Sequence, residues 1–488
     1  MNASSFFTIM NGLIFLCVLG LTIQAFIGLA FFISSIWEKE RRASVLAVVQ
    51  FAGMTVLLII FLFLAGRGFF KTSPGMGLLI GGCVMVILAA FFMVRRSAPN
   101  QRALQGATGY VVSKGNRFDE RTMVFARNRS IRPGSEQYDQ FYSEHPQLEK
   151  YDSKRREKGG PLGKIGLIDR PYEGPNVAAL LASISMPIHL CAPEIVKPQS
   201  HPWLNGKKID LSPSEATTRI KGYATNIGAD LVGITRINPL WIYSHRGEIF
   251  HENWEDWGSE IPAGHKYAVV MAHEMSVDMI GPAPHTPSLV ESMKNYAKGA
   301  YISAQLAAFI ANLGYGATAN HLRHYTAILP PLAVDAGLGE VGRLGYLITK
   351  EFGPRVRLSA VTTNLPLIPD KPVDIGVEDF CRFCKKCATC CPSESIPDDD
   401  EPKEFSGTLK WKLNGETCFA YWAKAGTDCC ICMKVCPWSH ARTFPHRLIV
   451  WLITRNKYAR RIFSVMDNIF YGRISIPKTA PKWARFEK

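Results

Sequence analysis

The sequence predicts an α/β domain that is preceded by three membrane-spanning helices and followed by a small cysteine-rich module. Three observations support this architecture. Long apolar runs are confined to the first 96 of the 488 residues. Between residues 212 and 362, short strand-like segments alternate with amphipathic helical segments, which indicates an α/β core. Ten of the 13 cysteines lie between Cys381 and Cys436.

The first 96 residues contain three apolar runs, at 6–36, 45–66 and 76–94. Each run has about the 20 residues needed to cross the hydrocarbon core of a bilayer. A cleaved signal peptide is not expected, because the first run is too long, lacks a basic start and is followed by no small-residue cleavage site. We therefore predict a three-helix transmembrane domain over 1–96.

Basic residues flank these helices unevenly. The tail before the first helix contains no basic residue. The flanking basic residues are Lys39, Arg41 and Arg42 in the first loop, Arg67 and Lys71 in the second loop, and Arg95, Arg96 and Arg102 after the third helix. The positive-inside rule then places everything after Arg95 in the cytoplasm. The N-terminal region has no twin-arginine export motif, which a folded metalloprotein would need for export. We expect a multi-pass protein of the cell inner membrane whose catalytic part faces the cytoplasm.

The net charge of +15 has a simple explanation in such a protein, because basic residues near the membrane meet anionic lipid. No helix-turn-helix, zinc-finger or RNA-binding signature accompanies the charge, so no nucleic-acid partner is expected. Residues 97–200 are polar, basic and rich in proline, and they are expected to form a surface-hugging linker with some extended segments.

The predicted α/β domain covers 201–375. Ser212-Pro-Ser-Glu215 is a capping box that opens a helix to about residue 227, where Gly228 ends it. A longer helix is predicted from Thr286 to Leu313, with Gly314 after it. Buried strands are predicted at 230–235, 266–272 and 355–362.

The cysteines have the spacing of a bacterial two-cluster ferredoxin, predicted here over 376–440. Cys381, Cys384, Cys387 and Cys391 fit the pattern C-x2-C-x2-C-x3-C-P. This pattern brings three thiolates to one [4Fe-4S] cluster and sends the fourth to the other. Structural zinc usually lacks the Cys-Pro ending. A disulfide framework belongs to small secreted domains.

The second cysteine run is truncated, because Gly426 stands where a full motif would begin. Cys418 is the available replacement ligand. Because the last cysteine of each motif binds the other motif's cluster, two ligand sets are predicted. One cluster is bound by Cys381, Cys384, Cys387 and Cys436, and the other by Cys418, Cys429, Cys432 and Cys391. Cys390 and Cys430 are left over. The chain is therefore predicted to carry single electrons.

Two further segments have open interpretations. Residues 337–342 form a G-x-G-x-x-G, but an apparently helical segment precedes it where a dinucleotide site needs a strand. A bend with close backbone approach to some other ligand is the expected role of Gly337 and Gly339. The C-terminal segment 441–488 is basic and amphipathic, so it is predicted either to lie on the membrane or to pack against the catalytic domain.

Together these features resemble the corrinoid-dependent reductive dehalogenases and their relatives, the epoxyqueuosine reductases. The resemblance covers about residues 200–473, and it rests on the cysteine motifs together with five segments: 229–234, 241–245, 331–343, 347–349 and 352–358. The family usually carries an export signal and docks on a separate three-helix membrane subunit. This chain departs from that plan, because its own first 96 residues look like that subunit fused to the enzyme.

The resemblance implies a nitroreductase-like domain that holds a base-off cobalamin, fed with electrons by two [4Fe-4S] clusters. None of the 12 histidines lies in a D-x-H-x-x-G pattern that would supply a lower cobalt ligand. The implied activity replaces the halogen of an organohalide with hydrogen. The alternatives are an epoxyqueuosine-reductase-like activity and a non-enzymatic membrane module that passes electrons from quinol to a partner.

The resemblance also implies site residues. Tyr301 falls where the dehalogenases have a proton-donating tyrosine, with Arg357 and His324, or Arg323 if the alignment slips by one, as the cations that would lower its pKa. Gly337, Gly339 and Arg343 are expected to contact the cofactor. Taken without the family, Tyr301 is more typical of a core tyrosine, Arg357 of an ion-paired strand residue and His324 of a structural histidine.

The first loop, Trp37-Glu-Lys-Glu40, is open to two interpretations. Trp37 suits the membrane interface with solvated charges beside it. Glu38 and Glu40 are also similar to a Glu-x-Glu motif of the family's membrane subunit, which implies a role near a quinol or another electron donor.

Overall fold

The computed structural model describes residues 3–159, 173–199 and 208–485. The chain divides into two compact units. The first contains residues 1–98 and 441–473, and the second contains residues 99–440 and 474–488. The boundary predicted between residues 200 and 201 lies outside the described residues.

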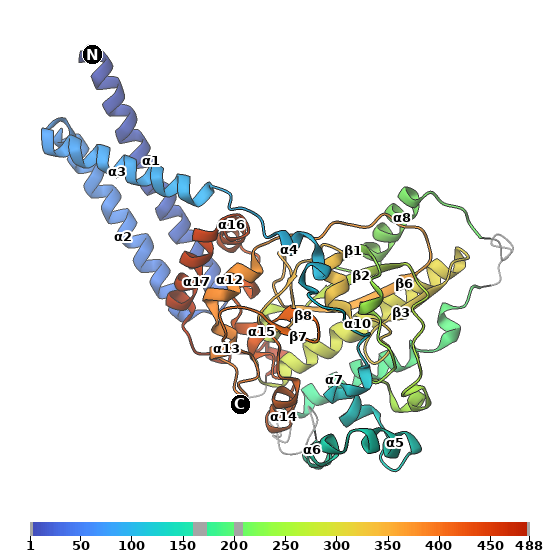
Figure 1. Cartoon of the computed structure of the whole chain (residues 1–488). Helices are drawn as coiled ribbons and strands as arrows, with labels where there is room; N and C mark the ends of the chain where they lie inside the picture. Colours follow the sequence, from blue (N-terminus) through green and yellow to red (C-terminus); the bar gives the residue numbers. More distant parts are fainter. Residues whose placement is uncertain (1–2, 160–172, 200–207, 486–488) are drawn as a thin grey trace. The chain divides into compact units, whose positions relative to one another are not determined.

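The first unit contains the three long apolar helices that the sequence predicts (Figure 1). They are α1 (Ala3–Trp37), α2 (Arg41–Gly66) and α3 (Ser73–Val94). All three are long and apolar enough to cross a membrane. Their outward-facing leucines, isoleucines and phenylalanines suit contact with lipid rather than water.

Two C-terminal helices complete this unit, α16 (Phe444–Ile453) and α17 (Lys457–Tyr471). Asn456 joins them to the end of α3. Its side-chain oxygen accepts from two N–H groups at the start of α17, and its amide donates to the carbonyls of Phe92 (2.5 Å) and Arg95 (2.6 Å). Residues 441–473 therefore pack with the apolar helices, whereas 474–488 belong to the second unit.

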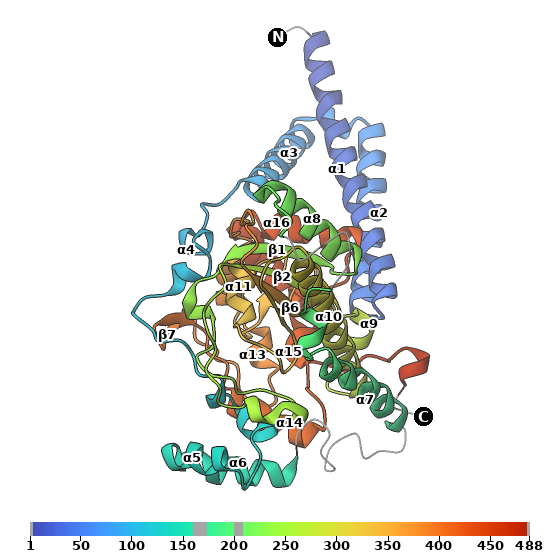
Figure 2. The same ribbon diagram turned by 90° about the vertical axis from the view of Figure 1, so that its right-hand side faces the viewer.

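The second unit is built on one four-stranded sheet of order β1-β2-β6-β3, of which Figure 2 labels β1, β2 and β6. Its strands are β1 (Leu231–Arg236), β2 (Tyr267–Glu274), β3 (Ala317–Asn320) and β6 (Val356–Thr363). All three strand pairs are antiparallel. The predicted mixture of helices and strands is present, but in the strict sense the arrangement is α+β rather than a parallel α/β fold. The sequence prediction missed β3.

Helices cover both faces of this sheet. In β2, Val269 and Met271 point to the core beneath α8 (Pro213–Asn226) and α10 (Thr286–Asn312), whereas Val270 and Ala272 point to the core beneath α11 (Leu329–Asp335). The predicted capping box is present at the start of α8. A strand buried on both faces explains the continuous apolar run at 268–272.

The region 97–200, expected to be a surface-hugging linker with some extended segments, contains helices that the sequence analysis did not predict. This region contains α5 (Glu136–Glu144), α6 (Pro146–Lys158) and α7 (Gly174–His189). Asp152 of α6 is fully buried in an ion pair with Arg127 (2.7 Å). Tertiary ion pairs of this kind order a segment whose polar composition alone suggests a loop.

The cysteine module consists of short elements. They are α12 (Val377–Cys384), α13 (Lys386–Thr389), β7 (Lys403–Phe405), β8 (Thr408–Lys410), α14 (Gly415–Ala425) and α15 (Ile431–Val435). The other short elements of the unit include α4 (Gln101–Leu104), α9 (Val277–Ile280), β4 (Glu340–Val341) and β5 (Leu347–Ile348).

Candidate functional site

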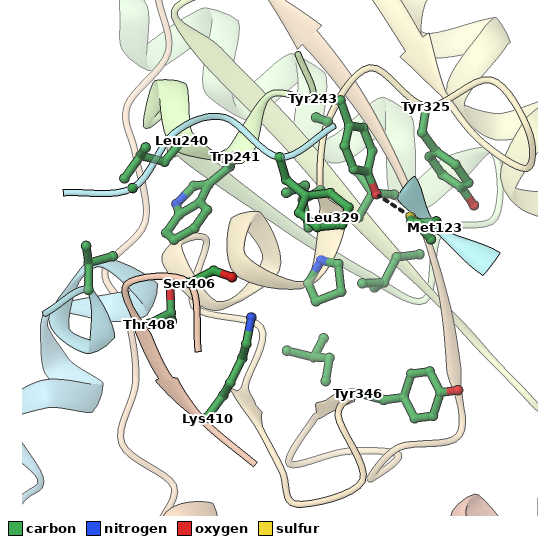
Figure 3. Close-up of a pocket in the computed structure, with 18 of the residues that line it drawn as sticks. Met123, Leu240, Trp241, Tyr243, Tyr325, Leu329, Tyr346, Ser406, Thr408 and Lys410 are labelled. Carbon is green, nitrogen blue, oxygen red and sulfur yellow. Dashed lines mark hydrogen bonds between the residues drawn. The ribbon is translucent and has the colours of Figure 1, made fainter. Parts of the chain in front are cut away.

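The second unit encloses a cavity of about 540 Å³ (Figure 3). Its walls come from distant parts of the chain: the segment 111–123, residues 240–243, α10, residues 325–330, residues 346–347, β6 and the β7–β8 hairpin. Most of the lining is apolar or aromatic. Four tyrosines line it, namely Tyr243, Tyr296, Tyr325 and Tyr346. Such a cavity suits an apolar ligand held by a few polar groups.

Arg357 of β6 lines this cavity, where the family resemblance placed it. Its Nη2 donates to Ser292 Oγ (2.7 Å) and forms an ion pair with Asp428 Oδ2 (3.2 Å). Its guanidinium lies 5.0 Å from the ring centroid of Tyr296. Burial opposes its charge, but the nearby Tyr296, Cys430 and Asp428 outweigh that effect and raise the pKa of Arg357. Arg357 is a permanent cation in the cavity wall.

Tyr296 of α10 is the tyrosine that Arg357 contacts. Burial raises the pKa of Tyr296, and the Arg357 guanidinium counteracts that rise. The phenol is therefore protonated at neutral pH, and a cation lies beside it that would stabilise the phenolate after proton transfer.

Tyr301, the predicted proton donor, does not lie beside this cavity. Tyr301 is 54% exposed and is not among the cavity-lining residues. Five positions along an α-helix rotate a side chain by about 500°, so Tyr301 points roughly 140° away from Tyr296. The sequence held a signal for this, because Lys294 and Lys298 share a helix face with Tyr301 and indicate a solvated face.

His324 does not line the cavity either, although its neighbour Tyr325 does. Its Nδ1 lies 2.8 Å from Nη2 of Arg246, and its ring stacks on His321. Burial lowers the pKa of His324 to about 3, with Arg246 adding to the shift. A neutral imidazole that accepts from an arginine cannot supply the expected positive charge. Arg323, the alternative, lies over the Phe250 ring at 5.1 Å and is also absent from the cavity lining.

The glycine segment approaches the protein's own backbone rather than the cavity. A Cβ at Gly337 would lie 2.5 Å from the carbonyl oxygen of Lys371, and one at Gly339 would lie 2.1 Å from that of Ile348. Gly337 also has a φ of +74°. Neither glycine lines the cavity. The glycines serve close packing of the chain, and their contact with a cofactor stays a prediction.

Arg343 binds the cysteine module instead. Its buried guanidinium donates to the Cys381 carbonyl (2.9 Å) and to those of Pro397 and Asp399 (both 2.7 Å). It also lies over the Trp411 ring at 4.7 Å. Arg343 thus joins helix α12, which carries Cys381 and Cys384, to the segment 397–399. It does not line the large cavity, but it lines the small cavity of the first cysteine set, and its contact with a cofactor stays a prediction.

The first predicted ligand set converges. Cys381, Cys384, Cys387 and Cys436 all line one small cavity, whose other walls include Ile348, Phe380 and Pro437. Burial raises the pKa of Cys387 well above its usual value, and charge on Cys381, Cys436 and Cys384 would raise it further. Four thiols around one space, three of them on buried cysteines and that of Cys384 on a half-buried one, suit an iron–sulfur cluster, since metal binding deprotonates them.

The second predicted set also lies together. Burial raises the pKa of Cys429 to about 12, and Asp428, Cys418 and Cys391 add to the shift. Burial likewise raises the pKa of Cys432, which interacts with Cys429 and Cys418. Cys430, a leftover cysteine, instead has its Sγ 3.8 Å from Ser292 Oγ. Four thiols from three segments again fit a cluster rather than isolated thiols.

This second set adjoins the large cavity. Burial raises the pKa of Tyr346, a lining residue, and charge on Cys432 and Cys418 would raise it further. Asp428 and Cys430, the neighbours of Cys429 in sequence, both lie next to Arg357. An electron carrier on these thiols would therefore be next to whatever occupies the cavity.

The first unit contains a separate polar cluster at the end of α1. Glu38 Oε1 lies 3.1 Å from His446 Nδ1 and accepts from Ser34 Oγ (3.1 Å). His446 Nε2 lies 2.8 Å from the hydroxyl of Tyr471. Both Glu38 and His446 are 5% exposed. Glu38 is therefore buried and hydrogen-bonded rather than a solvated interfacial charge, and the sequence prediction missed both of its C-terminal partners.

Known relatives resemble the chain over about half of its length. It is 34% identical over 294 residues to a tetrachloroethene reductive dehalogenase of Sulfurospirillum multivorans, covering 53% of this chain and 58% of the relative. A tetrachloroethene reductive dehalogenase of Dehalobacter restrictus is 34% identical over 295 residues, which is 52% of both chains. The chain thus spans about half the length of the curated relatives it matches. No family model matches it.

Solved structures agree with these relatives. A catabolic reductive dehalogenase in complex with 3-bromo-4-hydroxybenzoic acid has a TM-score of 0.59 at 26% identity, covering 79% of this chain and 51% of that one. A reductive dehalogenase structure described as suggesting a mechanism for B12-dependent dehalogenation has a TM-score of 0.54 at 29% identity, covering 75% and 50%.

Proposed function

We propose that this chain, which is similar to reductive dehalogenases over about half of its length, is an oxidoreductase that replaces a carbon-bound halogen with hydrogen. The reaction takes up two electrons and one proton, R–X + 2e⁻ + H⁺ → R–H + X⁻. The observation that carries the proposal is the cavity in which Tyr296 and Arg357 meet, next to the second cysteine set.

The cofactors are proposed from the same surroundings. The two cysteine sets would hold two [4Fe-4S] clusters, and the large cavity would hold a corrinoid, the cofactor class of the B12-dependent relative. The cavity fits that group, because its lining is mainly apolar and aromatic and contains few charged side chains. A bound corrinoid would supply the electrons that expel the halide.

The protein's own residues would supply the proton. Tyr296, kept protonated by burial, would donate its phenolic proton to the carbon that loses the halogen. Arg357 would stabilise the phenolate left behind. Ser292 and Asp428 would hold the Arg357 guanidinium in place through their contacts with Nη2. The apolar walls would exclude water that could compete as a proton source.

Cofactor content and halide release test the function together. The full chain would be purified anaerobically in detergent and assayed with a reduced viologen dye. Tetrachloroethene and 3-bromo-4-hydroxybenzoic acid, named for the relatives, are the first substrates to test. We expect about one cobalt and eight irons per chain, as two four-iron clusters require, and release of chloride or bromide. Iron without cobalt, even after corrinoid reconstitution, would leave only an electron relay.

We also propose that the helices α1–α3 anchor the chain with the remainder in the cytoplasm, and that Glu38 and Glu40 serve electron entry from a membrane quinol. The support is the hydrogen-bonded chain of Glu38, His446 and Tyr471, whose groups could accept the protons that a quinol releases when it is oxidised. The quinol and the orientation are proposals that rest on this cluster and on the flanking charges.

A comparison of halide release driven by quinol with halide release driven by viologen tests the membrane proposal. Glu38→Gln combined with Glu40→Gln should lower quinol-driven halide release at least tenfold, since one buried proton acceptor is lost. Viologen-driven release should remain unchanged, because viologen delivers electrons without this step. Equal rates with quinol before and after the substitutions would refute the role. A reporter fused after Lys488 that is active outside the cell would refute the orientation.

A further inference from the structure

Helix α17 of the first unit has its polar face buried and an apolar face exposed. Its buried residues include Arg460, Ser464 and Asp467, each at most 7% exposed. The large apolar side chains of the opposite face are 41% to 59% exposed, and they are Tyr458, Ile462, Val465 and Ile469. They follow one another at intervals of four, three and four positions, so at about 100° per residue they form one stripe, the α17 stripe.

This arrangement is the reverse of what water favours. A helix on the surface of a water-soluble protein buries its apolar side chains and exposes its polar ones. In α17 the buried polar groups have partners instead, because Arg460 Nε donates to the Ile453 carbonyl (2.7 Å) and Ser464 Oγ donates to the Arg461 carbonyl (2.8 Å). The inner face is therefore satisfied within the first unit, whereas the α17 stripe needs an apolar cover.

Both ends of α17 are attached near ends of the apolar helices. At its start, the Tyr458 ring lies 6.1 Å from the ring of Phe92, close to the end of α3. At its end, the Phe470 ring lies 5.0 Å from that of Phe31, in the last two turns of α1. The helix also packs against α2, beside which Figure 1 shows it. Three successive spans place the ends of α1 and α3 at the same membrane surface, so α17 lies along that surface.

Charged and aromatic groups beside the α17 stripe suit the headgroup region of a membrane. Lys457 and Arg461 are exposed, lie one turn apart and stand on one edge of the stripe. Their long side chains can reach anionic headgroups while the stripe next to them stays apolar. On α16, the Trp451 ring is partly exposed and lies 4.5 Å from the Arg455 guanidinium. Tryptophan is enriched at this depth of a membrane.

We propose that α17 is an interfacial membrane helix. The α17 stripe lies among the lipid acyl chains, and Lys457 and Arg461 lie at the level of the headgroups. This inference rests on the proposed anchoring by α1–α3 and adds a lipid contact from the other end of the chain. An interfacial helix enters the bilayer only to about 5–10 Å. It would keep Tyr471, its last residue, at the membrane surface beside Glu38.

Single introduced cysteines test this placement in the full chain. The chain would be inserted in nanodiscs of phosphatidylcholine and phosphatidylglycerol, one chain per disc, and treated with a water-soluble maleimide. Peptide mass spectrometry reads each introduced cysteine separately from the 13 native ones. Val465→Cys and Ile469→Cys should react at least about tenfold more slowly than Lys457→Cys, because the reactive thiolate forms poorly in apolar surroundings. Val56→Cys, near the centre of α2, is the reference for a lipid-facing position and should be equally slow.

The reference site separates failure of this inference from failure of the anchoring. If Val465→Cys and Ile469→Cys react as fast as Lys457→Cys while Val56→Cys is protected, the α17 stripe faces water and only the inference fails. Fast reaction of Val56→Cys would refute the anchoring as well. A photoreactive p-benzoylphenylalanine at position 465 then identifies the cover. Adducts with lipid acyl chains are expected, whereas adducts with residues 99–440 would mean that protein covers the stripe and would overturn the inference.

Discussion

In the cysteine module, three of the four thiols of the first set come from seven consecutive residues, Cys381 to Cys387. The cavity beside it takes its walls from segments spread between Val111 and Lys410. The position of a thiol in the module follows mainly from local spacing. The position of a side chain in the cavity depends on how a helix, a strand and several loops pack. The two regions therefore respond differently to substitution, and the predictions below use that difference.

The largest effect is expected at the cysteines. Cys436→Ser should remove one cluster and lower the iron content from about eight to about four per chain, because Cys436 closes the first set. Turnover with viologen should then be lost. Cys390→Ser is the matched control, because Cys390 lies outside both sets, and it should keep all the iron. Equal iron loss in both variants would mean that the sets are assigned incorrectly.

The pattern of this region is visible in the sequence for a physical reason. Cluster ligands must converge on a small rigid body, so the intervals between Cys381, Cys384 and Cys387 are constrained and visible in the sequence. The three apolar helices, the capping box of α8 and the strand β6 were visible for similar reasons, because each depends on a local pattern.

The cavity could not be predicted in the same way. The family resemblance points to Tyr301, whereas the tyrosine of α10 that lines the cavity lies five residues earlier, at Tyr296, and Tyr301 is on the exposed face of the helix. Gly337, Gly339 and Arg343 are expected from the resemblance to contact the cofactor, whereas the contacts that they make in the structure depend on tertiary packing. The partners Asp428 and His446 lie 71 and 408 positions from Arg357 and Glu38, beyond the range of any local pattern.

A smaller effect on the rate is expected at Arg357. Substitution of Arg357 and of its partner Asp428 should shift the pH–rate profile in opposite directions. Arg357→Met should lower halide release about 100-fold, the scale of losing support for an acid catalyst. Because the Arg357 charge lowers the pKa of Tyr296, its removal should move the alkaline limb of the pH–rate profile to higher pH. Asp428 raises that pKa, so Asp428→Asn should move the limb to lower pH. Profiles that shift in the same direction would contradict the proposed coupling.

The smallest effect concerns how α12, the helix that carries Cys381 and Cys384, is held. Glu340 is 3% exposed, and its carboxylate accepts from the N–H groups of Ile375 (2.7 Å) and Val377 (3.2 Å). Burial raises the pKa of Glu340 from 4.5 to about 7, with Asp374 adding to the shift. The unfolded chain then loses its proton at lower pH than the folded chain does.

The free energy of unfolding should therefore fall, by at most roughly 3 kcal/mol from this one group, as the pH rises from about 4.5 to 7. Above pH 7 this contribution should not change further. Glu340→Gln should remove this part of the pH dependence. Thermal midpoints of the detergent-solubilised chain between pH 5 and pH 8 measure it. Glu404→Gln, on the exposed hairpin, is the control and should follow the unaltered chain. If the thermal midpoints of Glu340→Gln change with pH in the same way as those of the unaltered chain, the Glu340 carboxyl is not the source of the pH dependence.

The most direct measurement of the central claim compares two tyrosines on one helix. Tyr296→Phe and Tyr301→Phe would each be assayed for halide release at equal corrinoid and iron content. The proposed mechanism predicts that Tyr296→Phe lowers the rate at least about 100-fold, the usual scale for losing a general acid. Tyr301→Phe should stay within about twofold, because that side chain points away from the cavity. The reverse order, or full activity in Tyr296→Phe, would contradict the assignment of the proton donor.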